Sequence, residues 1–322
     1  MAPKILITGA TGFIGKNLAP LIVRSKEARF LVRPTSNIGL LKNLENAEIV
    51  LGDLEQNYGL PDALDDIEIV IHCAARTMGK NYFEFYNTNT LGTINITSAM
   101  KKKAVKKILF LSSQAACGPA PNKRPLDEST PPRPISFYGR TKYLAEQAVI
   151  QSGLQYTILR PVSVYGPYDL DILRYIKLLN LGLGLIPGWG EKYINLIYVA
   201  DLVRVILKII ELDSFHNRIY FINDGNIYKF SELFDEISKI LKKKNIRIYI
   251  PKSLSLLAGL FNDIFLPEKR RLISRDKVRE ISARYWVCND SRAVTELNFK
   301  PEYSLEKGLK KTIKWYQEQG YI

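Results

Sequence analysis

The sequence predicts an α/β protein with a doubly wound parallel sheet, followed by a smaller C-terminal α/β lobe. As far as residue 160, short apolar runs alternate with helical stretches, which is typical of a parallel sheet covered by helices on both faces. Beyond that point the pattern is irregular. We therefore expect residues 1–165 to form the sheet domain and residues 166–322 mainly the lobe, with some C-terminal chain returning to the first domain.

The expected elements follow in order along the chain. Apolar runs with the length of buried strands lie at 4–7, 28–32, 47–51, 68–72, 107–112 and 156–159. Helical stretches lie at 16–23, 36–44, 59–65, 80–103 and 137–152. In the lobe we expect strands at 195–199 and 218–222, and helices at 200–212, 229–243, 252–265 and 305–318. Residues 181–190 are rich in glycine and contain a Pro-Gly pair, so a loop is expected there.

The first strand is followed at once by the run Thr8-Gly9-Ala10-Thr11-Gly12-Phe13-Ile14-Gly15. A strand, a glycine turn and a helix in this order predict a Rossmann dinucleotide site. Gly9 permits the tight turn, Gly12 lets the backbone approach a pyrophosphate, and Gly15 lets the helix pack close to the strand. The free N–H groups at the helix start favour the anion. The residues expected to bind the dinucleotide here are Gly9, Thr11, Gly12, Phe13 and Ile14.

A tyrosine and a lysine four residues apart, Tyr138 and Lys142, share one face at the start of an expected helix. Ser113 follows the strand that ends at the ligand-binding edge of the sheet. A hydride transfer at carbon requires a proton transfer at the attached oxygen, which a tyrosine can perform if its pKa, normally about 10, is lowered. We expect Lys142 to lower it and to bond the nicotinamide ribose, and Ser113 to hold the substrate oxygen. A second pair with this spacing, Tyr303 and Lys307, has no such strand before it and is expected to have no catalytic role.

These motifs, with five others, resemble the extended short-chain dehydrogenase/reductase family, also called the NAD-dependent epimerase/dehydratase family. The others are Gly52-Asp53-Leu54, His72-Cys73-Ala74-Ala75, Asn89-Thr90-Leu91-Gly92-Thr93, Leu111-Ser112-Ser113, and Leu159-Arg160-Pro161-Val162-Ser163-Val164-Tyr165-Gly166-Pro167. The resemblance covers nearly the whole chain. It is closest to the dihydroflavonol-reductase and 3β-hydroxysteroid-dehydrogenase branch, through the Val32-Arg33-Pro34 pattern and the tail from Asp290 to Pro301.

The resemblance implies an NAD(P)-dependent enzyme and assigns a role to each matching residue. Ser113, Tyr138 and Lys142 would be the catalytic triad. The residues implied to touch the cofactor, besides the glycine turn, are Asp53 and Leu54 at the adenine, Ala74 and Ala75 at the pyrophosphate and ribose, and Pro161 and Val164 at the nicotinamide. Family members commonly dimerise through the two helices that match 80–103 and 137–152. We therefore expect a homodimer in which Leu144, Ala145, Ala148 and Val149 meet the partner.

The end of the second strand indicates which cofactor is bound. An acidic residue there would bind the 2′-hydroxyl of NAD, but this chain has Arg33. A guanidinium suits a 2′-phosphate, so NADP(H) is favoured, with NAD(H) as the alternative and a merely solvated Arg33 as the simpler interpretation. No cluster of metal ligands is seen, and we expect no metal. His72, at a strand end, is expected to be a buried, hydrogen-bonded histidine rather than a catalytic one.

Three functions remain open for the substrate site. The first is an oxidoreductase acting on a carbonyl or a secondary alcohol, the second a nucleotide-sugar epimerase or dehydratase, and the third a non-catalytic nucleotide-binding scaffold. The sugar-nucleotide members have an arginine where this chain has Ile194, which favours the first; Lys192, Arg174 or Arg218 could compensate. The intact triad argues against the scaffold.

The formal net charge of +14 raises the question of an anionic partner. The lysine clusters lie at expected helix ends without interleaved aromatic residues, so we expect no nucleic acid partner. The apolar segment 254–261 is expected to be a core helix; a membrane-surface helix, with Lys269-Arg270-Arg271 near the headgroups, is the alternative. Three dispersed cysteines and the absence of a signal peptide or long apolar run predict a cytoplasmic protein.

Overall fold

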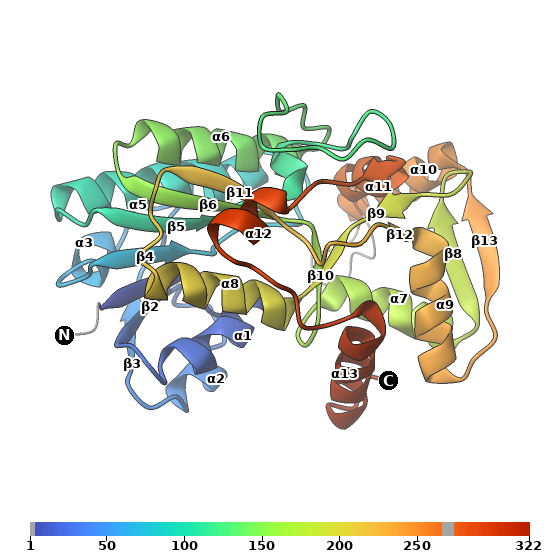
Figure 1. Ribbon diagram of the computed structural model, residues 1–322, viewed down its shortest axis with the longest axis horizontal. Helices are drawn as coiled ribbons and strands as arrows, with labels where there is room; N and C mark the ends of the chain where they lie inside the picture. Colours follow the sequence, from blue (N-terminus) through green and yellow to red (C-terminus); the bar gives the residue numbers. More distant parts are fainter. Residues whose placement is uncertain (1–3, 266–273) are drawn as a thin grey trace.

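The computed structural model describes residues 4–265 and 274–322. Its centre is a seven-stranded sheet with all neighbouring pairs parallel, in the order β11-β6-β5-β4-β1-β2-β3 (Figure 1). The strands are β1 Ile5–Thr8, β2 Ala28–Val32, β3 Ala47–Leu51, β4 Ile69–His72, β5 Lys107–Leu111, β6 Gln155–Pro161 and β11 Arg218–Ile222. The predicted doubly wound parallel sheet is confirmed.

Helices cover both faces of this sheet, and the alternation of side chains along each strand explains why. In β1, Ile5 and Ile7 pack into one apolar cluster and Leu6 into another, all fully buried. The first cluster is closed by α1 (Phe13–Ile22) and α8 (Val199–Glu211), which Figure 1 shows on one side of the sheet. The second is closed by α3 (Leu60–Ala63), α5 (Gly92–Lys102) and α6 (Phe137–Gln151). Because helices cover both faces, the central strands β1, β4 and β5 are almost entirely apolar.

The chain returns to the sheet after residue 165. Strand β11 pairs with β6, and α8 packs beside α1, so residues 199–222 complete the first domain. The expected helix at 80–103 is divided into α4 (Tyr82–Phe85), a π-helical turn η1 (Tyr86–Leu91) and α5. The expected helix at 36–44 is reduced to α2 (Gly39–Lys42).

The lobe has its own core, formed by α7 (Leu170–Asn180), α9 (Phe230–Leu241) and α13 (Leu305–Glu318) around a third apolar cluster. Small sheets join it to the first domain: β10 (Leu196–Tyr198) pairs with β7 (Ser163–Tyr165), and β9 (Tyr193–Ile194) lies between β12 (Tyr228–Lys229) and β14 (Tyr285–Trp286). Two shorter helices, α11 (Arg275–Ser282) and α12 (Ser291–Glu296), precede α13 in the chain.

The prediction of a loop at 181–190 is wrong in part. Residues Leu183–Pro187 form strand β8, which pairs in parallel with β13 (Ile246–Ile250). At Gly184 this strand packs close to Phe234. An added Cβ would lie 3.1 Å from the phenylalanine ring, so the position favours glycine. The partner strand is more than fifty residues away, which is why local composition alone indicated a loop.

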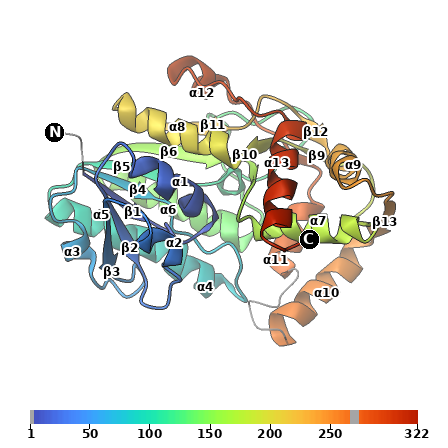
Figure 2. The same cartoon turned by 90° about the horizontal axis from the view of Figure 1, so that it is seen from below.

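Helix α10 (Lys252–Phe265) has the predicted bounds, but the interpretation as a core helix is wrong. Its residues contribute to none of the three apolar clusters. Five large apolar side chains are more than half exposed, namely Leu254, Leu257, Phe261, Ile264 and Phe265, which we call the outer face of α10. Figure 2 shows the helix at the edge of the lobe. Within the described residues no helix is long and apolar enough to cross a membrane.

Candidate active site

The glycine turn after β1 has the geometry that a dinucleotide requires. Gly9 has φ +76°, and a Cβ there would lie 2.6 Å from the backbone nitrogen of Ala74. A Cβ on Gly15 would lie 2.3 Å from the carbonyl oxygen of Gly9. At Gly12, by contrast, a Cβ would approach only that same oxygen, at 3.3 Å, so this position faces open space. A pyrophosphate therefore fits against Gly12 without displacing protein.

The start of α1 adds a favourable field for that anion. Its N-cap residue is Gly12, which has no side chain to bond the first N–H groups, and its first turn carries no acidic residue. Phe13 and Ile14 are in this turn, and Thr11 directly precedes the cap. Unpaired N–H groups and the helix dipole attract a phosphate. The chain thus fits the dinucleotide that its sequence predicts.

His72 links β1, β4 and α5 beneath this turn. Its Nδ1 lies 2.6 Å from the hydroxyl oxygen of Thr8 and its Nε2 lies 3.0 Å from that of Thr93. Burial, aided by the charge of Lys142, lowers the pKa of His72 to about 3. The imidazole is therefore neutral and fully buried, as expected for a structural histidine.

Asn89 fixes the loop that follows β4, which carries Ala74 and Ala75. Its side-chain oxygen accepts a hydrogen bond from the backbone N–H of Arg76 at 2.7 Å, and its amide donates to the Arg76 carbonyl at 3.1 Å. The same amide donates to the hydroxyl of Thr141 at 3.1 Å. Asn89 therefore ties this loop to α6, one residue before Lys142, a role that its position in a motif did not reveal.

The structure brings Ser113 and Tyr138 together. Ser113 follows β5, and its side chain caps a short 3₁₀ turn by accepting from the backbone N–H of Ala115 at 3.1 Å. Tyr138 lies in the first turn of α6, close enough to Ser113 that the serine side chain acts to lower the pKa of the phenol. Gly139 makes this approach possible, because a Cβ there would lie 2.3 Å from the carbonyl oxygen of Ala115.

Lys142 lies beneath this pair and is only 1% exposed. Its ammonium donates a hydrogen bond to the carbonyl oxygen of Leu111 at 2.7 Å and lies 4.1 Å from the centre of the Phe110 ring. Burial lowers the pKa of Lys142 to about 7, and the nearby carboxylate of Glu146 opposes this shift. Glu146 is held by two hydrogen bonds from Arg160, at 2.9 and 2.7 Å.

The prediction that Lys142 lowers the pKa of Tyr138 is not confirmed in the protein without a cofactor. Burial, together with the charge of Glu280, raises the pKa of Tyr138 to about 12. The opposing contributions come from the Ser113 side chain and from the charge of Lys277. Lys142 does not contribute to this shift; its ammonium instead donates to the carbonyl oxygen of Leu111.

Helix α11, in the lobe, contacts the start of the catalytic helix. The carboxylate of Asp276 accepts hydrogen bonds from the backbone N–H groups of Phe137 and Tyr138, at 2.6 and 3.1 Å. Glu280 accepts one from the hydroxyl of Ser136 at 2.7 Å, and Ser136 in turn caps α6 by accepting from the N–H of Gly139. Neither acid was predicted, because no local pattern shows that these residues meet a helix nearly 140 positions earlier.

Lys277 extends from α11 toward Tyr138 and α7. Its ammonium lies 3.5 Å from a carboxylate oxygen of Glu280 and 3.8 Å from one of Asp171. Burial lowers the pKa of Lys277, but these carboxylates outweigh that effect and raise it, so it is a permanent cation. Arg174, on the same helix as Asp171, pairs with it at 2.7 Å.

The other predicted cofactor residues follow strands at one edge of the sheet. Arg33 is exposed directly after β2 and is in no ion pair among the described residues. Asp53 turns its side chain to the N–H groups of Glu55 and Gln56, at 2.8 and 3.3 Å. Leu54, Pro161 and Val164 are buried or half-buried. Because the strands are parallel, their carboxyl ends share this edge with Gly12, Ala74, Ala75 and Ser113.

Of the three cations that could replace the missing arginine, Arg218 is excluded by its position. It begins β11, at the amino-terminal edge of the sheet opposite Gly12 and Ser113, and it pairs with Glu296. Ile194 is buried within β9. Lys192, two residues earlier, is 5% exposed, and burial lowers its pKa to about 8. The described residues contain no group of three side chains suited to a metal ion.

Comparisons with known proteins agree with this geometry. The NAD dependent epimerase/dehydratase family matches residues 5–222. A "Putative UDP-glucose 4-epimerase" of Methanocaldococcus jannaschii is 30% identical over 336 residues, covering 98% of this chain and 99% of that protein. An N-acetyl-alpha-D-glucosaminyl-diphospho-ditrans,octacis-undecaprenol 4-epimerase of Escherichia coli O157:H7 is 27% identical, covering 98% and 96%.

Among solved structures, a dTDP-glucose 4,6-dehydratase from Bacillus anthracis in complex with NAD has the same fold. The TM-score is 0.80 at 22% identity, and the match covers 98% of this chain and 97% of that one. The chain therefore belongs to the NAD-dependent epimerase/dehydratase family and is an enzyme.

Proposed function

We propose that the protein oxidises a secondary alcohol of a sugar carried on a diphosphate and then returns the hydride, as an epimerase or dehydratase does. The observation that carries the proposal is the proximity of Tyr138 to Ser113 at the sheet edge that also holds the glycine turn. Support for the substrate class comes from the relatives, whose names give a sugar joined to a nucleoside or polyprenyl diphosphate. This ranks the epimerase or dehydratase alternative above simple carbonyl reduction.

In this proposal Tyr138 accepts the proton of the sugar hydroxyl while the hydride leaves the same carbon. Ser113 bonds the reacting oxygen and keeps it within reach of the phenol. A bound NAD(P)⁺ would supply the hydride acceptor, held by Gly12 and the first turn of α1. Its positive charge and the Lys142 ammonium would both favour the phenolate, against the raised pKa that burial and Glu280 impose.

Lys142 is suited to the nicotinamide ribose because its ammonium has three donors and, among the described residues, donates one hydrogen bond, to the Leu111 carbonyl. Burial lowers the pKa of Lys142 to about 7, so near neutral pH it can release a proton as well as hold one. We propose that it orients the ribose and stabilises the tyrosinate.

For the cofactor we propose NADP(H), bound through Arg33, although solved relatives such as the Bacillus anthracis dehydratase hold NAD. Arg33 is exposed after β2, where the 2′-position of the adenosine ribose lies in a Rossmann site. For the diphosphate of the substrate we propose Lys192 or Arg174, the two remaining candidate cations in the lobe.

One observation favours a second function, the reduction of a carbonyl on a hydrophobic molecule. Ile194 is buried where the sugar-nucleotide enzymes carry an arginine, so the usual contact to a diphosphate is missing. A reductase of this kind would consume one external NADPH per turnover, whereas an epimerase would regenerate its cofactor.

The two functions are separated by one set of assays. The protein is incubated with UDP-glucose or UDP-N-acetylglucosamine, and separately with hydrophobic ketones and NADPH, while absorbance at the nicotinamide band and product formation are both followed. Conversion of the sugar without net change in absorbance supports the proposal. Loss of NADPH in step with ketone reduction, with no sugar conversion, refutes it in favour of the reductase.

A further inference from the structure

Helix α10 exposes large apolar side chains and buries polar ones, which is the reverse of a helix in a globular core. The outer face of α10 contains Leu254, Leu257, Phe261, Ile264 and Phe265, exposed by 56 to 66%. At about 100° per residue these five side chains fall within an arc of about 100°. The buried residues of the same helix are instead Ser255, Gly259, Asn262 and Asp263. A core helix buries its apolar stripe, whereas α10 presents that stripe to the surroundings.

Packing against α11 fixes this orientation. A Cβ on Gly259 would lie 2.8 Å from the backbone nitrogen of Arg275, so the two helices are in close contact at that point. Asp263 accepts a hydrogen bond from the same nitrogen at 3.0 Å and lies 3.6 Å from the Arg275 side chain. Rolling α10 to bury its leucines would break these contacts, so the outer face stays outward.

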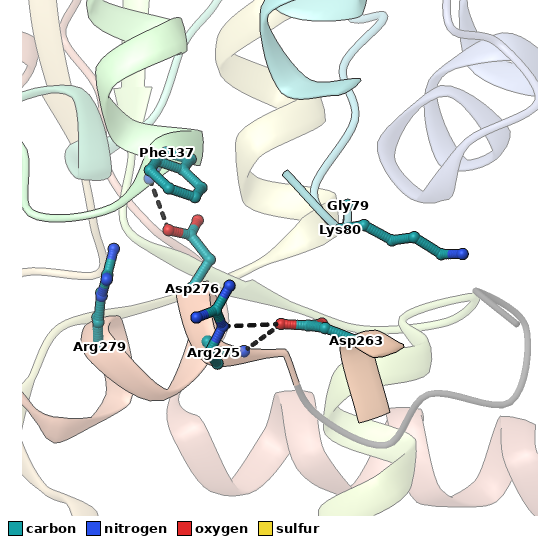
Figure 3. Close-up of a pocket in the computed structure, with 7 residues that line it drawn as sticks. All are labelled: Gly79, Lys80, Phe137, Asp263, Arg275, Asp276 and Arg279. Carbon is teal, nitrogen blue, oxygen red and sulfur yellow. Dashed lines mark hydrogen bonds and ion pairs between the residues drawn. The ribbon is translucent and has the colours of Figure 1, made fainter. Parts of the chain in front are cut away.

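Exposed cations lie near both ends of α10. Lys252 is exposed at the first position of α10. Beside the other end of the helix, a narrow cleft is lined by Gly79, Lys80, Phe137, Asp263, Arg275, Asp276 and Arg279 (Figure 3). Of its charged residues, Lys80, Arg275 and Arg279 are exposed, while Asp263 and Asp276 are buried. The outer face carries no acidic residue, and the whole chain has a formal charge of +14.

We propose that α10 is an interfacial helix that docks the enzyme on an anionic bilayer surface. An exposed apolar stripe on a helix with cations near its ends, in a chain of net positive charge, suits the boundary of anionic headgroups and acyl chains. A helix of 14 residues is about 21 Å long, shorter than the ~30 Å hydrocarbon core, so it lies on the membrane instead of crossing it. The inference stands apart from the proposed reaction.

Docking through α10 would place the catalytic helix near the bilayer. The cleft that borders α10 contains Phe137 and Asp276, and Asp276 bonds the backbone of Tyr138. Helix α11 contacts both α10 and the start of α6. A membrane surface at α10 therefore lies beside the start of the catalytic helix.

Vesicle binding tests the proposal. The intact protein is floated with vesicles of phosphatidylglycerol and phosphatidylethanolamine, and separately with phosphatidylcholine alone. We expect binding to the anionic vesicles that weakens as salt rises. The double variant Leu257→Glu/Phe261→Glu should bind at least about tenfold more weakly, because two apolar anchors are lost and two negative charges are added. The control Leu212→Glu changes a leucine that is equally exposed, at 53%, but lies at the end of α8, and should bind as wild type.

A site-specific probe supplies the second readout. Phe261→Trp should show a blue-shifted emission with anionic vesicles, and Leu212→Trp should not. Failure of the wild type to float with any vesicle, or equal binding by the double variant, overturns the proposal. So does a wild-type oligomer, seen by sedimentation without lipid, that the double variant dissociates while vesicles do not bind; the outer face would then cover a second copy. A cooperative thermal unfolding transition of the double variant, at the wild-type midpoint, confirms that it is folded.

Discussion

Asp276, in the lobe, accepts a hydrogen bond from the backbone N–H of Tyr138 in the first domain, at 3.1 Å. Its other carboxylate oxygen accepts from Phe137 at 2.6 Å, so one side chain satisfies two of the first N–H groups of α6. Ser136 satisfies a third, that of Gly139. The position of the phenol thus depends on a residue supplied by the lobe, and the lobe is coupled to catalysis at this point.

Replacing Asp276 with alanine should therefore lower kcat more than it raises KM. Loss of an N-terminal cap costs about 0.5–2 kcal/mol, and we expect roughly tenfold in kcat as the phenol moves from its best position. Asp276→Asn keeps one acceptor oxygen, so its kcat should lie between those of the wild type and Asp276→Ala. Ser304→Ala removes a cap of the same kind from α13 and is the control: it should reduce thermal stability without changing kcat. Equal kcat in Asp276→Ala and Ser304→Ala would contradict a positioning role.

Glu280→Gln should shift the pH dependence of turnover. Together with burial, the Glu280 charge raises the pKa of Tyr138 to about 12, so removing the charge favours the phenolate and lowers that pKa. For oxidation of an alcohol, in which Tyr138 acts as the base, the rate rises as the phenol ionises. The rising limb of the pH–rate profile should accordingly move to lower pH in the variant. Gln keeps the acceptor for Ser136. An unchanged rising limb would mean that the Glu280 charge does not affect the pKa of Tyr138 during turnover.

Tyr138→Phe should abolish turnover while leaving cofactor affinity nearly unchanged. The ring still packs, but the transferable proton is lost, and such groups contribute roughly 10²- to 10⁴-fold. Tyr303→Phe removes the hydroxyl of the second Tyr-Lys pair, which accepts a hydrogen bond from the ammonium of Lys311 at 3.3 Å. That control should keep its rate. Retention of most of kcat by Tyr138→Phe would refute the catalytic assignment.

The first domain could be predicted closely because its signals are local. Each parallel strand is a short apolar run with both faces covered, and the glycine turn is defined by eight consecutive residues. Ser113 and Tyr138 could be paired because strand order places the end of β5 at the ligand edge. The lobe depends on distant partners: β8 exists because β13 lies beside it, and Asp276 matters because α6 begins there.

Helix α10 shows a different limit of the sequence. Its residues 252–265 were assigned correctly as a helix, and its apolar stripe is visible in the sequence. Periodicity gives the stripe but not the direction it faces. Only the contacts of Gly259 and Asp263 with Arg275 settle that the polar side is turned inward.

Arg33→Ala should weaken NADPH binding far more than NADH binding. A charge-assisted hydrogen bond to the 2′-phosphate is worth about 1.5–3 kcal/mol, or ~10- to 150-fold in Kd. Fluorescence titration of both cofactors measures the ratio. Arg24→Ala, an exposed arginine two residues beyond α1, is the control and should change neither affinity. An equal loss for the two cofactors would mean that Arg33 does not bind the 2′-phosphate.

The expected homodimer involves a different set of residues from those first proposed. Ala145 and Val149 are fully buried against their own sheet, so they cannot meet a partner. Leu144 is 37% exposed and Phe83, on α4, is 71% exposed. Leu144 also lines a groove with Tyr82, Pro134, Phe137, Arg140 and Tyr143. We therefore predict pairing through the outer sides of α4 and α6.

Leu144→Glu should dissociate this dimer, because a carboxylate replaces an apolar side chain in the contact and is costly to bury there. Sedimentation at micromolar protein concentration should show a dimer for the wild type and a monomer for the variant. Because α6 carries Tyr138 and Lys142 at its start, the monomer should also lose activity as the helix loses support. Leu212→Glu, at the end of α8, controls for an added surface charge and should remain dimeric. A wild type that sediments as a monomer with full activity would show that catalysis does not require the dimer.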